Sequence, residues 1–237
     1  MQMPRGVGKA LEKAITTKEG SSLEGAKGET KFEFMNKSRQ EIFQFLCLHP
    51  CSNTTTISKA TGLSLHATSW HLRRLVESDF VSKKTMGKKT VFYPVNMIST
   101  KDIPILEILN TDKAKAIYLA ILEKKGISQK EICEMIGLKH QAVIWYTKKL
   151  ESLGLISSLE DGKFRRYYPT ELLFQKKEEN SKRIKIFKDE IIKRFHKQRL
   201  SPTILRSTQE KIVVRIARGG SRAVLTLNMN PFLTVLS

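Results

Sequence analysis

Two stretches of this sequence place hydrogen-bonding and positively charged side chains at matching positions of a short apolar pattern. The first stretch runs from Gly62 to Leu75, and the second runs from Gly137 to Leu150. Arginine and glutamine can each make a pair of hydrogen bonds to the edge of one base, and lysine and arginine bind phosphate. These residue types therefore point to recognition of a nucleic acid.

Each stretch is predicted to be a helix that follows a tight turn. The glycine at its start suits a turn between two helices, and Ser64 is expected to cap the first helix, whereas Lys139 makes a weaker cap for the second. The residues expected to face the core in the first stretch are Ala67 or Thr68, Leu72 and Leu75. Their three-and-four spacing is typical of one buried helix face.

The opposite face of each helix holds the candidate base-contacting residues. In the first stretch they are Ser64, Leu65, His66, Ser69, Trp70 and Arg73. In the second stretch they are Lys139, His140, Gln141, Ile144, Trp145 and Lys148. A helix of this kind enters the major groove with its N-terminal residues at the base edges. The two matched tryptophans have a second interpretation, in which they brace the helix against the segment that follows.

The two stretches belong to a longer duplication with an offset of 75 residues. The identical pairs include Ile42/Ile117, Ile57/Ile132, Ala67/Ala142, Trp70/Trp145, Leu75/Leu150, Gly87/Gly162 and Tyr93/Tyr168. A period of this length is too long for a solenoid repeat, so each copy is expected to bury its own core. We expect the first domain at residues 35–98 and the second at residues 111–173. Asn36 and Thr111 are the expected caps of their first helices.

A β-hairpin is predicted after each candidate contact helix, because two short apolar strands flank a charged turn there. Such a hairpin would contact phosphate or the minor groove. Its basic residues are Lys83, Lys84, Lys88 and Lys89 in the first copy and Lys163, Arg165 and Arg166 in the second. A charged hairpin that is merely solvated is the alternative. The second hairpin also contains Glu160 and Asp161, which would repel phosphate.

Each copy resembles a winged helix-turn-helix domain of the broad ArsR/MarR-like group. The resemblance lies in the Ser69-Trp-His-Leu72 core, the Asp79-Phe-Val81 exit and the Gly87 to Pro94 hairpin. Tryptophan before His-Leu, and two such domains in one chain, resemble archaeal transcription regulators, among which the euryarchaeal activator of archaellum genes is one candidate type. The resemblance covers residues 36–172 and implies a DNA-binding transcription regulator, an activator in the candidate type.

The remaining segments differ from the repeat in composition. Residues 1–34 are expected to hold a short amphipathic piece and a flexible linker. The connector at residues 99–110 is too apolar for a free linker, so it is expected to pack. Residues 174–237 carry 15 Lys/Arg against 5 Asp/Glu. They are predicted to form a helix over 178–200 and a hairpin of Ile212–Ile216 with Ala223–Leu227, to which Phe232–Leu236 could add a third strand.

The predicted C-terminal helix has an apolar stripe on an otherwise basic surface. The stripe consists of Ile184, Phe187, Ile191 and Phe195. Three roles compete for it: a dimerisation helix, a basic helix that lies on DNA, and a helix that covers a domain core. Long apolar stripes need a protein partner, which favours dimerisation or internal packing. The predicted fold class is thus α+β and helix-rich, with two tandem winged helix-turn-helix domains followed by a long helix and a β-hairpin.

The formal net charge of +19 and the isoelectric point near 9.9 imply a polyanionic partner, either nucleic acid or an anionic membrane surface. No apolar run is long enough for a spanning helix, the N-terminus lacks a signal peptide pattern, and three cysteines do not suggest a disulfide framework. We therefore expect a cytoplasmic protein without a membrane partner. The expected partners are double-stranded promoter DNA, a second copy through the C-terminal helix, and the basal transcription machinery.

Catalytic and metal-binding patterns are weak in this sequence. There is no Gly-rich phosphate loop, no His-Glu-x-x-His and no Cys-x-x-Cys pair, so we expect no enzyme activity and no cofactor. His66, His71 and His140 with Cys47 and Cys51 could suggest a metal sensor, but core and turn roles suffice for the cysteines. The alternative functions are a non-specific architectural nucleic-acid binder and a winged-helix scaffold that docks on the transcription machinery.

Overall fold

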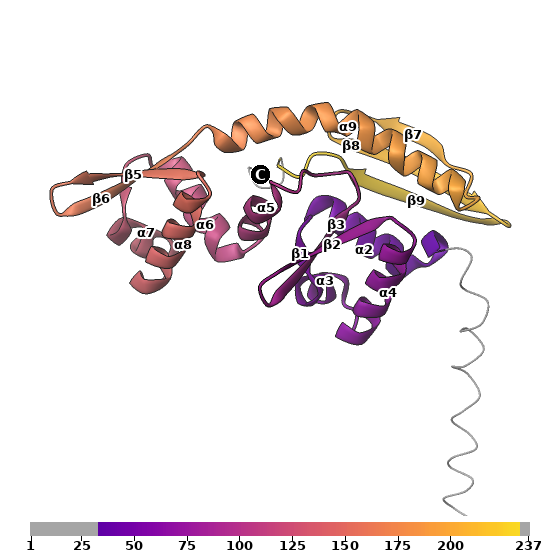
Figure 1. Ribbon diagram of the computed structural model, residues 1–237, viewed down its shortest axis with the longest axis horizontal. Helices are drawn as coiled ribbons and strands as arrows, with labels where there is room; N and C mark the ends of the chain where they lie inside the picture. The colour runs from indigo at the N-terminus through magenta and orange to yellow at the C-terminus, as the bar shows by residue number, and fades with distance from the viewer. Residues whose placement is uncertain (1–32, 233–237) are drawn as a thin grey trace, which may run out of the picture.

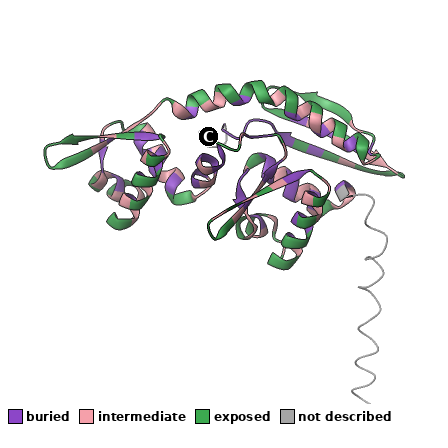
Figure 2. Cartoon of the chain, in the orientation of Figure 1, coloured by how far each residue is buried: buried purple, intermediate pink, exposed green. Residues whose placement is uncertain are grey.

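The computed structural model describes residues 33–232 of the chain. The predicted N-terminal amphipathic piece, most of the predicted linker and the last five residues lie outside this range. The described fold is mixed, with helices of varied length and three-stranded antiparallel sheets (Figure 1). Exposed residues gather on the outer faces of the helices and on the hairpin tips (Figure 2).

The first structural unit begins with the short 3-10 helix η2 (Glu33–Met35) and continues with three α-helices and three short strands. These elements are α2 (Lys37–Leu48), β1 (Ser52–Asn53), α3 (Thr54–Thr61), α4 (Leu65–Glu77), β2 (Val81–Met86) and β3 (Lys89–Pro94). Asn36 caps α2 as predicted, since its side chain accepts a hydrogen bond from the amide of Arg39 at 3.2 Å. The strands form a sheet in the order β1-β3-β2, so the predicted hairpin gains a short third strand.

The second structural unit repeats this element order with the same 75-residue offset. It consists of α6 (Asp112–Glu123), β4 (Ile127–Ser128), α7 (Gln129–Ile136), α8 (His140–Ser152), β5 (Ile156–Asp161) and β6 (Phe164–Pro169). Its sheet has the equivalent order β4-β6-β5. The predicted cap of α6 needs correction, because Thr111 stands at the N-cap position but its side chain makes no capping hydrogen bond.

Buried apolar side chains fill the interior of each unit. Ile42, Phe43, Leu72 and Leu75 are at most 1% exposed in the first unit, and the repeat places equivalent residues in the core of the second. Either Ala67 or Thr68 was expected to face the core from α4. Thr68 does so, because it is fully buried while Ala67 is only partly buried. Thr68 tolerates burial because its hydroxyl donates to the carbonyl of Ser64 at 2.8 Å.

The apolar connector forms helix α5 (Ile103–Leu109) between the two units. Its Ile103, Leu106 and Leu109 are nearly inaccessible to solvent. The side-chain amide of Asn110, which follows α5, donates a hydrogen bond to the carbonyl of Pro50 in the first unit. The connector is therefore a packed element of the structure.

Helix α9 (Leu172–Lys197) leaves the second unit directly after β6 and extends along one side of the molecule to the first unit (Figure 1). The predicted start at residue 178 is therefore late by six residues. At its C-terminal end, the ring of Phe195 lies 5.0 Å from that of Phe34 and 5.6 Å from that of Phe80, between centroids. Arg194 Nε also lies 3.5 Å from Asp79 Oδ2. The helix thus spans both units.

A C-terminal sheet follows α9 in the order β7 (Thr203–Ser207), β8 (Lys211–Arg218) and β9 (Ser221–Asn228). The predicted hairpin is present as β8 and β9. The third strand of the described sheet is β7, which precedes the hairpin. Of the segment Phe232–Leu236, which was expected to add a strand, Phe232 lies in a turn and the other residues lie outside the described range. The apolar stripe of α9 joins the same buried cluster as Ile212, Val214 and Leu225 of this sheet. The stripe is therefore covered within this chain.

Candidate nucleic-acid interface

The turn before each candidate contact helix has the geometry of a helix-turn-helix. Gly62 ends α3 with a left-handed φ of 70°, and Gly137 ends α7 with a φ of 65°. Glycine adopts this conformation without the steric penalty of a Cβ atom. The Ser64 hydroxyl then accepts from the amide of Ala67 at 3.1 Å, while Lys139 makes no side-chain cap. As predicted, the cap of the first contact helix is stronger than that of the second.

The outward face of α4 and α8 contains almost all of the predicted contact residues. In the first unit the exposed candidates are the N-cap Ser64 and, on α4, Leu65, His66, Ser69, Trp70 and Arg73. In the second unit they are the N-cap Lys139 and, on α8, His140, Gln141, Trp145 and Lys148. Ile144 is the exception, since it is only partly exposed. Both helices lie on the side of the molecule away from α9 (Figure 1).

The ring contacts of the two tryptophans come from helices. Arg39 of α2, which is 1% exposed, places its guanidinium carbon 5.2 Å from the centroid of Trp70. Arg39 Nε also donates to His71 Nδ1 at 3.5 Å, so α2 supports this part of α4. Trp145 is 58% exposed, and its ring meets that of the adjacent Tyr146. The interpretation in which the tryptophans brace the helix requires a contact between each tryptophan and a hairpin. Within residues 33–232, no ring contact joins either tryptophan to a hairpin.

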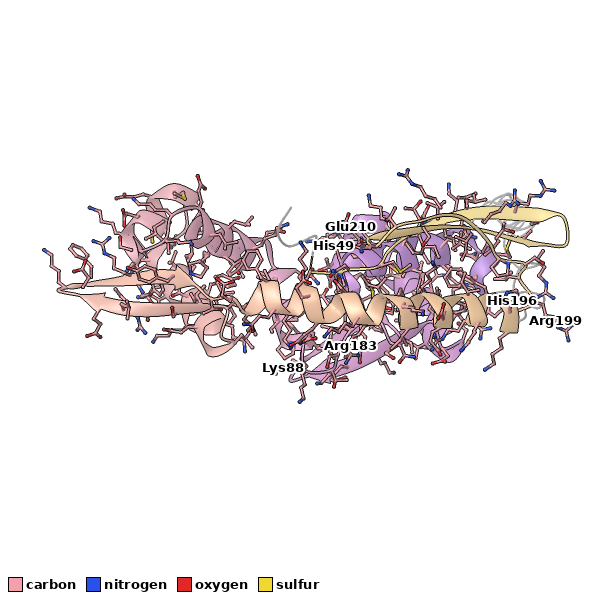
Figure 3. All side chains as sticks on the ribbon, turned by 90° about the horizontal axis from the view of Figure 1, so that it is seen from above. His49, Lys88, Arg183, His196, Arg199 and Glu210 are labelled. Carbon is pink, nitrogen blue, oxygen red and sulfur yellow. The ribbon has the colours of Figure 1, made fainter. Side chains whose placement is uncertain are left out.

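The β2–β3 hairpin carries four lysines and no carboxylate. Lys83 and Lys88 are exposed and Lys84 is half-buried, and in the described part of the chain none of the three pairs with a carboxylate. Lys88 lies at the edge of the molecule in Figure 3. Lys89 differs from them, because its Nζ atom lies 3.1 Å from Glu107 Oε1 of α5. Lys89 therefore also anchors the hairpin to the connector helix.

The β5–β6 hairpin has its two arginines engaged within the chain. Arg165 pairs with Glu151 of α8 at 3.2 Å, and its Nε atom donates to Ser158 Oγ at 2.7 Å. Arg166 pairs with Asp161 at 3.1 Å and with Glu131 at 3.4 Å. These two predicted phosphate contacts are thus held by carboxylates of their own unit.

The remaining cation of the second hairpin is Lys163, which lies beside an exposed apolar side chain, Phe164. The Nζ atom of this exposed lysine is 5.4 Å from the centroid of Phe164. Phe164 is 43% exposed and Leu159 is 63% exposed. With the 75-residue offset, Ser158, Leu159 and Phe164 stand where the first hairpin has Lys83, Lys84 and Lys89. Alignment of the two hairpins position by position would have revealed this difference from the sequence.

Glu131 organises the base of the second hairpin, and it was not among the predicted site residues. It forms a capping box with Ser128 at the start of α7. Hydrogen bonds from Lys124 and then from the side chain and backbone of Ser128 lower the pKa of Glu131 to about 2. The available sequence signal was the Ser-x-x-Glu spacing, which is typical of a helix start.

The cysteines and histidines of the metal-sensor alternative are dispersed. Among residues 33–232, no group of three or more His, Cys, Asp or Glu side chains is arranged to hold a metal ion. Burial raises the pKa of the Cys47 and Cys51 thiols, which keeps them protonated. In the same range, no helix combines the length and apolarity needed to cross a membrane.

The helices of the second unit match the model of a known protein family, while the match ends at the start of β5. Residues 110–157 match the family model of winged helix-turn-helix DNA-binding domains. The chain is also 28% identical, over 141 residues, to an uncharacterised HTH-type transcriptional regulator of Methanocaldococcus jannaschii. The match covers 60% of this chain and 35% of the relative, so the chain spans about a third of the length of the relative it matches.

Solved structures give only distant similarities. ScpB from Mycobacterium tuberculosis aligns with 58% of this chain and 92% of its own at 15% identity, with a TM-score of 0.24. Human N-acetylserotonin methyltransferase aligns with 65% of this chain and 45% of its own at 12% identity, with a TM-score of 0.26. Similarities at this level carry no argument about fold or function.

Proposed function

We propose that this protein is a transcription regulator that binds double-stranded DNA in a sequence-specific way. The observation that carries the proposal is the repeated helix-turn-helix, in which α4 and α8 each present a solvent-exposed face of hydrogen-bonding residues. The match of residues 110–157 to a winged helix-turn-helix DNA-binding family supports the proposal for the second unit. The same element order and offset extend it to the first unit.

In the proposed complex, each unit reads one half-site in the major groove. His66, Ser69 and Arg73 approach base edges from α4, and His140 and Gln141 approach them from α8. Because these two sets of side chains differ, the two half-sites differ in sequence. Bases, rather than phosphates alone, then determine where the protein binds, which separates this proposal from a non-specific architectural binder.

One chain is sufficient for this arrangement. Most single-domain helix-turn-helix proteins reach two half-sites by dimerisation, whereas here α5 and α9 connect the two reading units. Helix α9 has 26 residues and is about 39 Å long, close to the roughly 34 Å that separates successive major grooves on one face of DNA. The apolar stripe of α9 is used within the chain, so it provides no separate argument for a dimer.

The orientation of the two units further specifies the proposed site. In Figure 1, the free tips of the β2–β3 and β5–β6 hairpins point toward the same end of the long axis. Units related by a two-fold axis across the DNA would point their hairpins in opposite directions. We therefore propose that the half-sites are arranged head to tail rather than as a palindrome.

Selection from random duplex DNA tests this function. The full chain is incubated with the random pool at about 150 mM salt, a concentration at which long-range electrostatic attraction is screened, and the bound duplexes are sequenced. We expect a motif of two unlike half-sites in head-to-tail order. No enrichment, together with tight salt-sensitive binding, would contradict sequence-specific recognition. A palindromic motif would contradict the head-to-tail arrangement alone.

A further inference from the structure

The two hairpins differ in how much positive charge they offer to a ligand. In the β2–β3 hairpin, Lys83, Lys84 and Lys88 have no carboxylate partner among residues 33–232. In the β5–β6 hairpin, both arginines pair with carboxylates and only Lys163 lacks one. The second hairpin also contains Glu160 and Asp161, whereas the first has no acidic residue. The first hairpin therefore offers three lysines without a carboxylate partner to a ligand, and the second offers one.

The ion pairs of the second hairpin are built into its fold. Glu151 belongs to α8 and also accepts a hydrogen bond from Ser158 at 2.6 Å, so its position is fixed from two sides. Glu131 belongs to the capping box of α7 and accepts from Ser128 and Lys124 as well as pairing with Arg166. An arginine that turned toward a phosphate would leave a carboxylate behind, close to the negative DNA backbone. Binding phosphate with this hairpin would therefore cost the internal pairs and add repulsion.

Salt-dependent affinity for DNA depends on the number of phosphates that cationic side chains neutralise, because each neutralised phosphate releases condensed counterions. An arginine that remains paired with a carboxylate neutralises no phosphate and releases no counterion. The three lysines of the first hairpin have no carboxylate partner, so each can neutralise a phosphate. In the second hairpin, only Lys163 can do so.

We infer that the β2–β3 hairpin is the phosphate anchor of the two hairpins, and that Lys83, Lys84 and Lys88 supply most of the hairpin contribution to salt-dependent affinity. The β5–β6 hairpin adds little phosphate binding, because its two arginines are paired with carboxylates. This inference rests on the proposed DNA-binding function, and it assigns unequal roles to the two repeats.

The experiment compares two matched variants of the full chain. One carries Lys83→Ala, Lys84→Ala and Lys88→Ala, and the other carries Arg165→Ala and Arg166→Ala. The equilibrium constant for a random-sequence duplex is measured between about 50 and 200 mM salt, and the slope of log K against log salt is obtained. We expect the lysine variant to reduce the magnitude of the slope by about 3, or roughly 1 for each phosphate that is no longer neutralised. The arginine variant is expected to keep the slope of the parent chain within about 0.5.

A gain-of-charge variant guards against a loss that reflects misfolding. Leu159→Lys gives the second hairpin the lysine that the first has at Lys84, at a position that needs no core rearrangement because Leu159 is exposed. This variant is expected to raise the magnitude of the slope by about 1. Thermal unfolding of every variant shows that the fold is intact.

Three results would overturn the inference. Equal slopes for the lysine variant and the parent chain would show that the first hairpin is no anchor. A slope reduced by the arginine variant as much as by the lysine variant would show that the internal ion pairs open on DNA. A parent chain that does not bind duplex DNA would overturn the proposed function itself, so the two failures are distinguishable.

Discussion

Lys176 at the start of α9 and Asp102 just before α5 form an ion pair, with 3.3 Å between Nζ and Oδ1. The side chain of Asp102 is 7% exposed and that of Lys176 is 20% exposed, so this pair is largely shielded from water. It joins the two segments that connect the units, one on each side of the second repeat. This pair holds the start of α9 against the connector, and the contacts of Phe195 and Arg194 hold its other end against the first unit.

Removing one partner of this pair should be more harmful than removing both. Lys176→Met leaves the Asp102 carboxylate in a shielded site without its counter-charge, and we expect a loss of about 3 kcal/mol in the free energy of unfolding. The double variant Asp102→Asn with Lys176→Met should recover most of that loss. Denaturant unfolding of the two variants measures the difference. Equal destabilisation by both variants would show that charge pairing is not the source of the effect.

Stability at acid pH should depend on Glu131. Its pKa is about 2 in the folded protein against an ordinary value of 4.5, so the folded state favours the ionised form. The stabilisation is fully present above about pH 4.5 and is lost as the pH falls through that value toward 2. We expect Glu131→Gln to lower the melting temperature near neutral pH and to match the parent chain near pH 2, as followed by circular dichroism.

Glu134→Gln provides the control for this pH effect. Glu134 lies one turn further along α7, where it forms a surface ion pair with Lys130 at 3.8 Å. Such exposed pairs contribute about 0.5 kcal/mol or less. A pH dependence of Glu134→Gln as strong as that of Glu131→Gln would contradict the assignment.

The hydroxyl of Tyr118 offers a test of core polarity. It is buried without a hydrogen-bond partner among the described residues, and burial, with a smaller effect of Glu171, raises the pKa of Tyr118 to about 12. The repeat has Phe43 at the same position. We expect Tyr118→Phe to leave the melting temperature unchanged or raise it. The reciprocal Phe43→Tyr should destabilise by about 1 to 3 kcal/mol, because it buries a hydroxyl without a partner.

Base recognition should be separable from phosphate binding. Gln141→Ala should reduce binding by on the order of 1 to 3 kcal/mol at particular base pairs and leave other duplexes unaffected. Arg73→Ala should behave in the same way at the other half-site. The measurement is competition between single-base variants of the selected duplex. A uniform loss of affinity for all duplexes would place Arg73 among the phosphate contacts instead.

Local pattern along the chain was enough to predict one part of the structure. The 75-residue repeat, the glycine turns, the capping serine and the exposed faces of α4 and α8 all follow from spacing along one or two helices. The β8–β9 hairpin likewise follows from two apolar strands around Gly219 and Gly220. In these elements the deciding interactions connect residues close together in the chain.

Long-range contacts determine which charges are available and which apolar faces are covered. Arg166 and Glu131 are 35 positions apart, so the contact between their side chains could not be predicted from the spacing of residues in the hairpin. The two-residue strand β1 forms because the neighbouring strand β3 supplies its hydrogen-bond partners, although Ser52 and Asn53 show little strand pattern. From the sequence alone, the stripe of α9 was compatible with a dimer interface, with a basic helix on DNA and with a helix that covers a core, and the pattern favoured dimerisation or internal packing. Its burial against Phe34, Phe80 and the C-terminal sheet depends on contacts that only the folded chain brings together.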